Sequence, residues 1–343
     1  MPVKQFADTS SVSIAYAIDS AATASELSAT EFKYVPFTTE GFSLAKESQQ
    51  STAITSDRRP SGSKNTQGSA SGSVGTEFGY APFVLDMLKL AVMNEWTEDL
   101  TAADGSFYAT DGDIRQFFVV EKRIKGQKAG VKTNFFERYF GNLVNEATIE
   151  IGGSDLVSFT VNTMAAFGDT TNADASTDDN AGGLVTTYTK PESYEIADAS
   201  NNVSKITLKD ADGTPMEVVW SDATLTITNN VREQGGVGSE FAAGMTMGKV
   251  NASLSGTIYY YDDSVLNAHL KNEAVSAELE VSTSEGVFII HLPKLKAESP
   301  SANAQGENQD YTQSLTLNAE RGTVNLDGSD QECVVALVHR PAA

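Results

Sequence analysis

Short runs of alternating apolar and polar residues recur along most of the chain and predict β-strands. In residues 314–319, Leu315 and Leu317 alternate with Thr316 and Asn318, and this period of two is typical of a half-buried strand. The Ser-Glu-Gly sequence at residues 284–286 joins two apolar runs and indicates a tight hairpin turn. Similar β-branched or aromatic runs occupy residues 114–124, 147–151, 156–161, 206–208, 218–220, 224–228, 253–261, 277–281, 287–292 and 333–338. The predicted fold class is therefore mainly β.

Two segments have helical spacing instead. Residues 82–93 begin with a proline, which suits a first helical position, and the apolar side chains that follow are spaced three or four residues apart. Residues 263–272 form a weaker candidate that begins with possible capping residues, Asp263 and Ser264. Each segment follows an aromatic strand directly, so we expect one flanking α-helix in each half of the chain.

Three polar stretches have no apolar periodicity and are expected to be loops. They are residues 46–67, the acidic residues 169–183 and residues 299–308. Loops of this length in a compact domain are usually functional arms or disordered segments, and the sequence leaves both possibilities open.

An internal repeat gives the clearest indication of domain organisation. The Gly-Thr-Glu-Phe-Gly-Tyr sequence at 75–80 leads into Val84-Leu85-Asp86, and Gly-Thr-Ile-Tyr-Tyr-Tyr at 256–261 leads into Val265-Leu266-Asn267. The offset is 256 − 75 = 181 throughout. Chance similarity between two amphipathic strand–helix turns is the alternative, but the shared spacing favours duplication. We therefore expect two tandem, related β domains, residues 1–185 and 186–343.

The composition excludes several classes of protein. The chain has 343 residues, with 24 Lys plus Arg against 46 Asp plus Glu, which gives a net charge of −22. A protein that holds nucleic acid through its phosphates needs a basic surface, and this chain is strongly acidic. The single cysteine, Cys333, excludes an internal disulfide framework. No basic and apolar leader is evident in residues 1–30, and no apolar run is long enough for a bilayer, so we expect a chain made in soluble form without membrane contact.

No motif supports catalysis, a cofactor or a metal. His269, His291 and His339 have no His or Cys neighbours at metal-ligand spacing, and Cys333 lies within an apolar run. A basic stretch with interleaved phenylalanines contains Arg115, Lys122, Arg123, Lys125, Lys128, Lys132 and Arg138. It could contact a nucleic-acid strand. In a chain of net charge −22, a salt-bridged strand face or a contact with acidic neighbouring subunits is favoured.

The order of these elements resembles that of the tail tube (major tail) proteins of long, flexible-tailed bacteriophages. The matching features span about residues 30–320 and are individually modest. They comprise residues 34–37, 40–44, a Ser/Glu/Asp-Arg loop at 47–60, 72–80, 94–96, 117–122, 139–145, 156–162, 224–230, 248–261 and 291–296.

The resemblance implies a β-sandwich-like or barrel-like tube domain that closes into stacked rings around a channel for genomic DNA. Residues 46–67 are then the candidate arm to the adjacent ring. Typical family members close six tube domains into a ring, so a chain with two such domains favours a pseudo-sixfold trimer, with a plain hexamer as the second choice. Other expected partners are the tape-measure protein and the tail terminator or tip proteins. Our candidate contacts between rings or subunits are Glu47, Asp57, Arg58, Arg59, Arg115, Lys122 and Arg123.

The acidity has a mechanistic interpretation in such a tube. A wall rich in Lys and Arg would retain DNA, whereas an acidic or neutral wall would let it slide. Acidic residues that merely keep the unassembled protein soluble are the simpler explanation. Two other functions remain possible, namely another virion or cell-surface β-rich binding or adhesion protein, and an acidic β-fold hydrolase. The expected location is the virion tail, after synthesis in the host cytoplasm.

Overall fold

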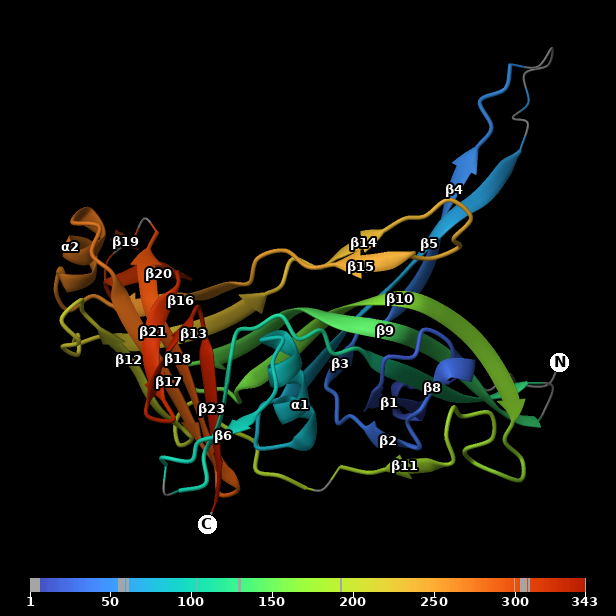
Figure 1. The fold of residues 1–343 in the computed structure, drawn as a ribbon, viewed down its shortest axis with the longest axis horizontal. Helices are drawn as coiled ribbons and strands as arrows, with labels where there is room; N and C mark the ends of the chain where they lie inside the picture. Colours follow the sequence, from blue (N-terminus) through green and yellow to red (C-terminus); the bar gives the residue numbers. More distant parts are fainter. Residues whose placement is uncertain are drawn as a thin grey trace.

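The computed structural model describes residues 7–54, 59, 62–102, 104–128, 131–191, 193–298, 300–302, 307 and 309–342. The fold is mainly β, with one large sheet and two α-helices among the described residues. In Figure 1 most of the first half of the chain lies to the right and most of the second half to the left, while residues 232–246 of the second half reach to the right over the first half. A hairpin rises from the first half well beyond the body of the molecule.

Six strands and a helix form the framework of the first half. They are β1 (Val12–Ile18), β4 (Ser43–Gln50), β5 (Ser63–Glu77), α1 (Pro82–Ala91), β8 (Phe118–Lys128), β9 (Val131–Gly152) and β10 (Ser158–Asp174). All their pairings are antiparallel, in the spatial order β4-β5-β10-β9-β8-β1. Pro82 occupies the first turn of α1, and Phe83, Val84, Met87 and Leu88 are buried as the helical spacing predicts.

The second half repeats this framework. Its elements are β12 (Val203–Lys209), β13 (Val219–Thr228), β16 (Asn251–Tyr259), α2 (Ser264–Leu270), β17 (Val275–Ser282), β18 (Gly286–Ala297) and β20 (Thr312–Ala319). Their antiparallel pairings follow the order β13-β16-β20-β18-β17-β12. Within this framework, each half thus has one strand before the β4–β5 or β13–β16 pair, a helix directly after that pair, and the same neighbours in the sheet.

The two halves are joined by strand pairing and by a common core. Residues 146–152 of β9 pair with residues 222–228 of β13, so one sheet continues from the first half into the second. The largest buried cluster contains side chains from both halves. Across this junction the rings of Phe78 and Phe288 lie 5.1 Å apart, and those of Tyr80 and Phe288 lie 5.2 Å apart.

Short elements complete the fold, most of them joined to the large sheet and four of them forming two separate two-stranded sheets. They are β2 (Glu31–Tyr34), β3 (Thr39–Glu40), β6 (Thr97–Glu98), β7 (Phe107–Thr110), β11 (Thr187–Thr189), β14 (Arg232–Gln234), β15 (Gly244–Thr246), β19 (Ser301–Ala302), β21 (Gly322–Leu326), β22 (Ser329–Cys333) and β23 (Ala336–Pro341), with 3-10 turns at Thr9–Ser11 and Ala24–Glu26. The hairpin turn predicted at residues 284–286 is confirmed by mutual backbone hydrogen bonds between Thr283 and Gly286.

Three predictions about elements need correction. Much of the expected loop 46–67 is strand, because β4 and β5 pair from Ser43↔Ser71 out to Gln50↔Ser63. The expected loop 169–183 begins as strand, since β10 continues along β9 to Asp174. The strand predicted at 333–338 is two strands, because β22 ends at Cys333 and β23 begins at Ala336.

Candidate functional site

One face of the central sheet is lined by short polar side chains. Cross-strand registers place its residues in rows across β5, β10, β9, β13, β16 and β20. We call this surface the polar face. Its members are Ser73, Gly75 and Glu77 from β5, Ser158, Thr160 and Asn162 from β10, Glu146, Thr148 and Glu150 from β9, Asp222, Thr224, Thr226 and Thr228 from β13, Asn251, Ser253, Ser255 and Thr257 from β16, and Ser314, Thr316 and Asn318 from β20.

The residues that alternate with the members of the polar face along each strand point into the core, so the polar face is the side of the sheet turned away from the core. Ile149 and Leu225 are each 2% exposed, Leu254 is 2% exposed and Leu317 is fully buried. The alternation follows from the strand period of two, since burying one face leaves the other for solvent. The sequence pattern of Ser and Thr between buried aliphatic residues was therefore a usable signal for this surface, although our candidate contacts did not include it.

The polar face is acidic and carries no Lys or Arg among its members, and Lys296 of β18 lies directly beside it, opposite Asn318. Its carboxylates accept hydrogen bonds from neutral groups. Asn162 Nδ2 donates to Glu146 Oε1 at 2.8 Å, and Ser158 Oγ donates to Glu150 Oε2 at 3.3 Å. The backbone N–H of Thr257 donates to Asp222 Oδ1 at 3.2 Å. Because no cation of the face neutralises these groups, the surface presents a net negative potential.

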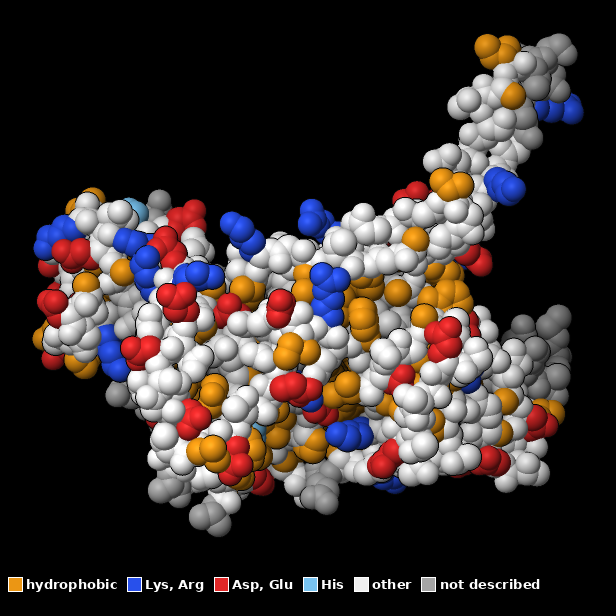
Figure 2. Space-filling view, in the orientation of Figure 1, with side chains coloured by type: hydrophobic (Ala, Val, Ile, Leu, Met, Phe, Trp, Pro, Cys, Tyr) orange, Lys and Arg blue, Asp and Glu red, His pale blue; other side chains and the backbone are white. Residues whose placement is uncertain are grey.

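The β4–β5 hairpin and the segment containing β14 and β15 form two arms. Figure 2 shows the long arm covered mainly by uncharged polar side chains. Ile54, near its tip, is 100% exposed, and Val237 is comparably exposed in the turn between β14 and β15. The turn between β14 and β15 touches the long arm, where Lys46 forms an ion pair with Glu240 and the Gly68 N–H donates to Glu240 O at 2.7 Å.

The candidate contact residues fall into three groups. Glu47, Arg59 and Arg115 are exposed, with Glu47 and Arg59 on or near the long arm. Asp57 and Arg58 lie outside the described residues. Lys122 and Arg123 are each only 8% exposed, which makes them poor candidates for contacts with another chain.

The two buried cations have partners inside the chain. Lys122 Nζ lies 2.9 Å from Glu40 Oε1 and 3.4 Å from Glu137 Oε2. Arg123 donates to Tyr34 OH at 2.7 Å and to Asn180 Oδ1 at 2.6 Å. For these positions the structure supports the salt-bridged strand face that the sequence offered as an alternative.

A neighbouring ion pair anchors the acidic segment that follows β10. Arg138 Nε donates to Glu121 Oε2 at 3.1 Å, with the Glu121 side chain 2% exposed. Glu121 also accepts from the Leu184 N–H at 3.0 Å and from the Tyr188 hydroxyl. Burial and the nearby Glu121 carboxylate both raise the pKa of Tyr188, so this phenol stays protonated and serves as a donor.

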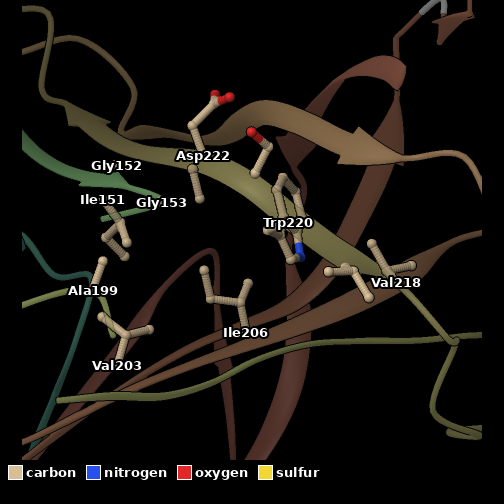
Figure 3. Close-up of a pocket in the computed structure, with 12 residues that line it drawn as sticks. Ile151, Gly152, Gly153, Ala199, Val203, Ile206, Val218, Trp220 and Asp222 are labelled. Atoms are coloured by element: carbon tan, nitrogen blue, oxygen red, sulfur yellow. The ribbon is translucent and has the colours of Figure 1, made fainter. Parts of the chain in front are cut away.

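A recess at the junction of the two halves is lined mainly by apolar side chains. Figure 3 shows Val203, Ile206, Val218 and Trp220 around it, with the Asp222 carboxylate pointing away. Its lining residues include no second carboxylate and no His, Lys or Tyr that could act as an acid or base with Asp222. Among the described residues, no group of three or more His, Cys, Asp or Glu side chains is arranged to hold a metal ion.

The other sequence candidates are structural. Burial raises the pKa of the Cys333 thiol to about 12, which keeps it protonated and a poor nucleophile. His339 is buried against Tyr80 and Phe107, and His269 bonds the Ala297 carbonyl. Neither helix in the described part of the chain has the length or the continuous apolar sequence of a membrane span.

These features define a β-rich protein with an acidic sheet face and projecting arms, which suits a structural role. The family described as "Phage tail tube protein" matches residues 9–319. The chain therefore belongs to the phage tail tube proteins, and it is a structural component of the bacteriophage virion. No curated protein matches the chain.

Proposed function

We propose that this protein polymerises into stacked rings that form a non-contractile tail tube, with the polar face lining the channel for genomic DNA. The observation that carries the proposal is the polar face itself, which crosses both halves of the chain, contains Glu77, Glu146, Glu150 and Asp222, and has no Lys or Arg. DNA binds tightly wherever several cations displace its counterions, so a wall of hydroxyls and carboxylates lets the polyanion pass without retention.

We further propose that residues 1–185 and 186–343 are two related tube domains and that three chains close one ring. The shared strand order and the helix after each hairpin support duplication. The β9–β13 pairing supplies one domain junction inside the chain, so three chains provide six domains around a pseudo-sixfold axis. The long arm, with Glu47 and Arg59, and the exposed Arg115 are the proposed contacts with neighbouring rings or subunits.

Electron microscopy of the purified protein tests the assembly. We expect hollow tubes or rings at high protein concentration, and persistent monomers under all conditions would contradict the proposal.

A charge-reversal experiment tests the channel wall. Replacing Glu146→Lys and Glu150→Lys together puts two cations on the polar face of every chain. We expect tubes of this variant to retain double-stranded DNA at low salt and to release it steeply as salt rises, whereas wild-type tubes retain little. The control is Glu273→Lys combined with Glu217→Lys, two exposed positions that are not on the polar face. Equal retention by the two double variants would contradict the assignment of the wall.

A further inference from the structure

The repeated framework indicates how one copy of the chain joins the next. Inside the chain, β13 of the second half pairs with residues 146–152, the C-terminal end of β9. We call this part of the strand the far end of β9. The counterpart of β13 in the first half is the line formed by β3 and β4, which pair with β5 in one register from Thr39 to Lys46. The counterpart of the far end of β9 is β19, which continues the line of β18 along β20.

Both counterpart strands have a free edge among the described residues. β3 and β4 pair only with β5, and β19 pairs only with β20. Figure 1 places β4 and β19 in opposite halves of the view, so the edges belong to separate ends of the molecule. An unpaired strand edge offers N–H and C=O groups to another chain, and a closed ring would leave no such edge.

The register follows from matching the two halves position by position. β5 ends at Glu77 and β16 ends at Tyr259, 182 residues later, so Gly72 matches Leu254, and both are buried. This structural offset is one residue longer than the 181 of the sequence repeat, which would match the buried Leu254 to Ser73 of the polar face. Gly72 is paired with Thr163 and Leu254 with Leu317, which makes Thr163 and Leu317 equivalent. Four residues earlier, Phe159 pairs with Ile149 and Gln313 pairs with Ala302. Ala302 is therefore the counterpart of Ile149.

The same matching identifies the partner strand. A Cβ at Gly72 would collide with the Phe42 ring, so Phe42 lies beside Gly72 as Leu225 lies beside Leu254. Phe42 and Leu225 are both buried, at 7% and 2% exposed. Since Leu225 pairs with Ile149 inside the chain, the equivalent pairing between chains joins Phe42 to Ala302.

The backbone directions agree with this register. The Gly41 N–H donates to Ser73 O at 2.9 Å, so the next residue, Phe42, directs its N–H away from β5. In the single chain that Phe42 N–H donates to Glu40 Oε2 at 3.2 Å. On the other strand the Glu298 N–H donates to Thr316 O, and Ser301 lies opposite Ser314 two residues along β20. The backbone N–H and C=O of Ser301 thus point toward β20, and those of Ala302 point toward the free edge.

We propose that the β3–β4 edge of one copy pairs antiparallel with β19 of the next copy, with Phe42 opposite Ala302 and Ser43 opposite Ser301. The partner is a second copy of this chain, and the inference rests on the proposed ring assembly. The pairing extends the polar face across the subunit boundary, because Ser43 and Ser301 are exposed and lie on the side away from the buried Phe42.

Disulfide trapping tests this register. In the proposed pairing Ser43 and Ser301 form a non-hydrogen-bonded pair, with Cα atoms about 4.5 Å apart, within the range that a disulfide spans. We expect Ser43→Cys and Ser301→Cys, assembled together from separate chains and oxidised, to give covalent dimers. About one junction in four should be linked in an equal mixture, because each head-to-tail contact uses one edge from each neighbour. Each variant alone should give none.

The controls separate this inference from the proposed function. Mixing Ser43→Cys with Ser329→Cys, an exposed serine on β22, should give no dimer. The native Cys333 is buried and present in every sample, so it contributes the same background. Tubes without cross-links in the Ser43–Ser301 mixture would overturn the register while leaving the tube proposal intact. Failure of the wild-type chain to form tubes would instead count against the proposed function.

Discussion

At the scale of single residues, His339 links the two halves of the molecule. Its Nδ1 lies 2.7 Å from the Tyr80 hydroxyl, and its ring stacks on Phe107 at 5.1 Å between centroids. The Trp96 ring meets it edge-on at 4.5 Å. Burial among these rings lowers the pKa of His339 from 6.5 to about 4, so the imidazole is neutral in the folded protein at neutral pH.

This lowered pKa predicts a pH dependence of stability. Between pH 6.5 and about 4 the unfolded chain binds a proton that the folded chain does not, so the stabilisation is complete above pH 6.5 and is lost as the pH falls towards 4. We expect the free energy of unfolding of unassembled protein to fall by about 2 to 3 kcal/mol more in wild type than in His339→Gln between pH 7.5 and 4.5. Urea titrations at the two pH values measure this difference. Equal losses of unfolding free energy in wild type and His339→Gln would contradict the assignment of the pH dependence to His339.

The buried Glu121 predicts a large effect of a single substitution. Glu121→Ala leaves Arg138 without its counter-ion and leaves the Leu184 N–H without its acceptor. Removing one partner of a buried pair costs about 3 to 5 kcal/mol, which we expect in urea unfolding. The exposed pair between Arg321 and Glu332, at 3.4 Å, is the control, and Glu332→Ala should cost less than about 1 kcal/mol. Similar losses in the two variants would show that Glu121 has no special role.

At the scale of elements, the arms are the features that the sequence pattern misassigned. Residues 43–50 have mostly exposed side chains, so the strand shows no alternation that a period-two search can detect. The helix α1 was predictable because its apolar positions must face a core. The break between β22 and β23 was not predictable, since Cys333, Val335 and Ala336 are all buried and form one apolar run.

The long arm also carries a prediction about ring stacking. Ile54 is fully exposed in the single chain, and burying an isoleucine against another ring is worth about 1.5 to 3 kcal/mol per contact. We expect Ile54→Asp to shorten tubes or stop growth at isolated rings. Thr52→Asp, on the same exposed arm, is the charge-matched control and should leave tube length closer to wild type. Tube lengths of the two variants are measured in electron micrographs. Ile54→Asp tubes as long as those of wild type would contradict a role of Ile54 in ring stacking.

At the scale of the whole molecule, the duplication predicts the number of chains in a ring. The strand order that the two halves share supports the duplication suggested by the 181-residue offset, although the ends of β5 and β16 lie 182 residues apart. We expect end-on averages of the tubes to show three chains per ring with six similar density lobes. Six complete chains per ring would contradict the two-domain assignment.

The polar face illustrates the limit of reading function from sequence. The alternation of Thr224, Thr226 and Thr228 with buried aliphatic residues was visible, but which strands lie side by side was not. Only the register across β9, β13 and β16 shows that hydroxyls and carboxylates from both halves form one continuous surface without a cation.

The β9–β13 junction has a kinetic consequence for assembly. Because it joins two halves of one polypeptide, it forms at an effective concentration set by the tether, which is on the order of millimolar for short linkers and independent of how much protein the host has made. In the proposed ring, three such chains would form three joints between chains, where six separate domains would have to form six. In the proposed ring every second joint lies within one polypeptide, so the joints between chains would set the concentration threshold at which rings appear, and mutations that weaken growth should concentrate their effect there.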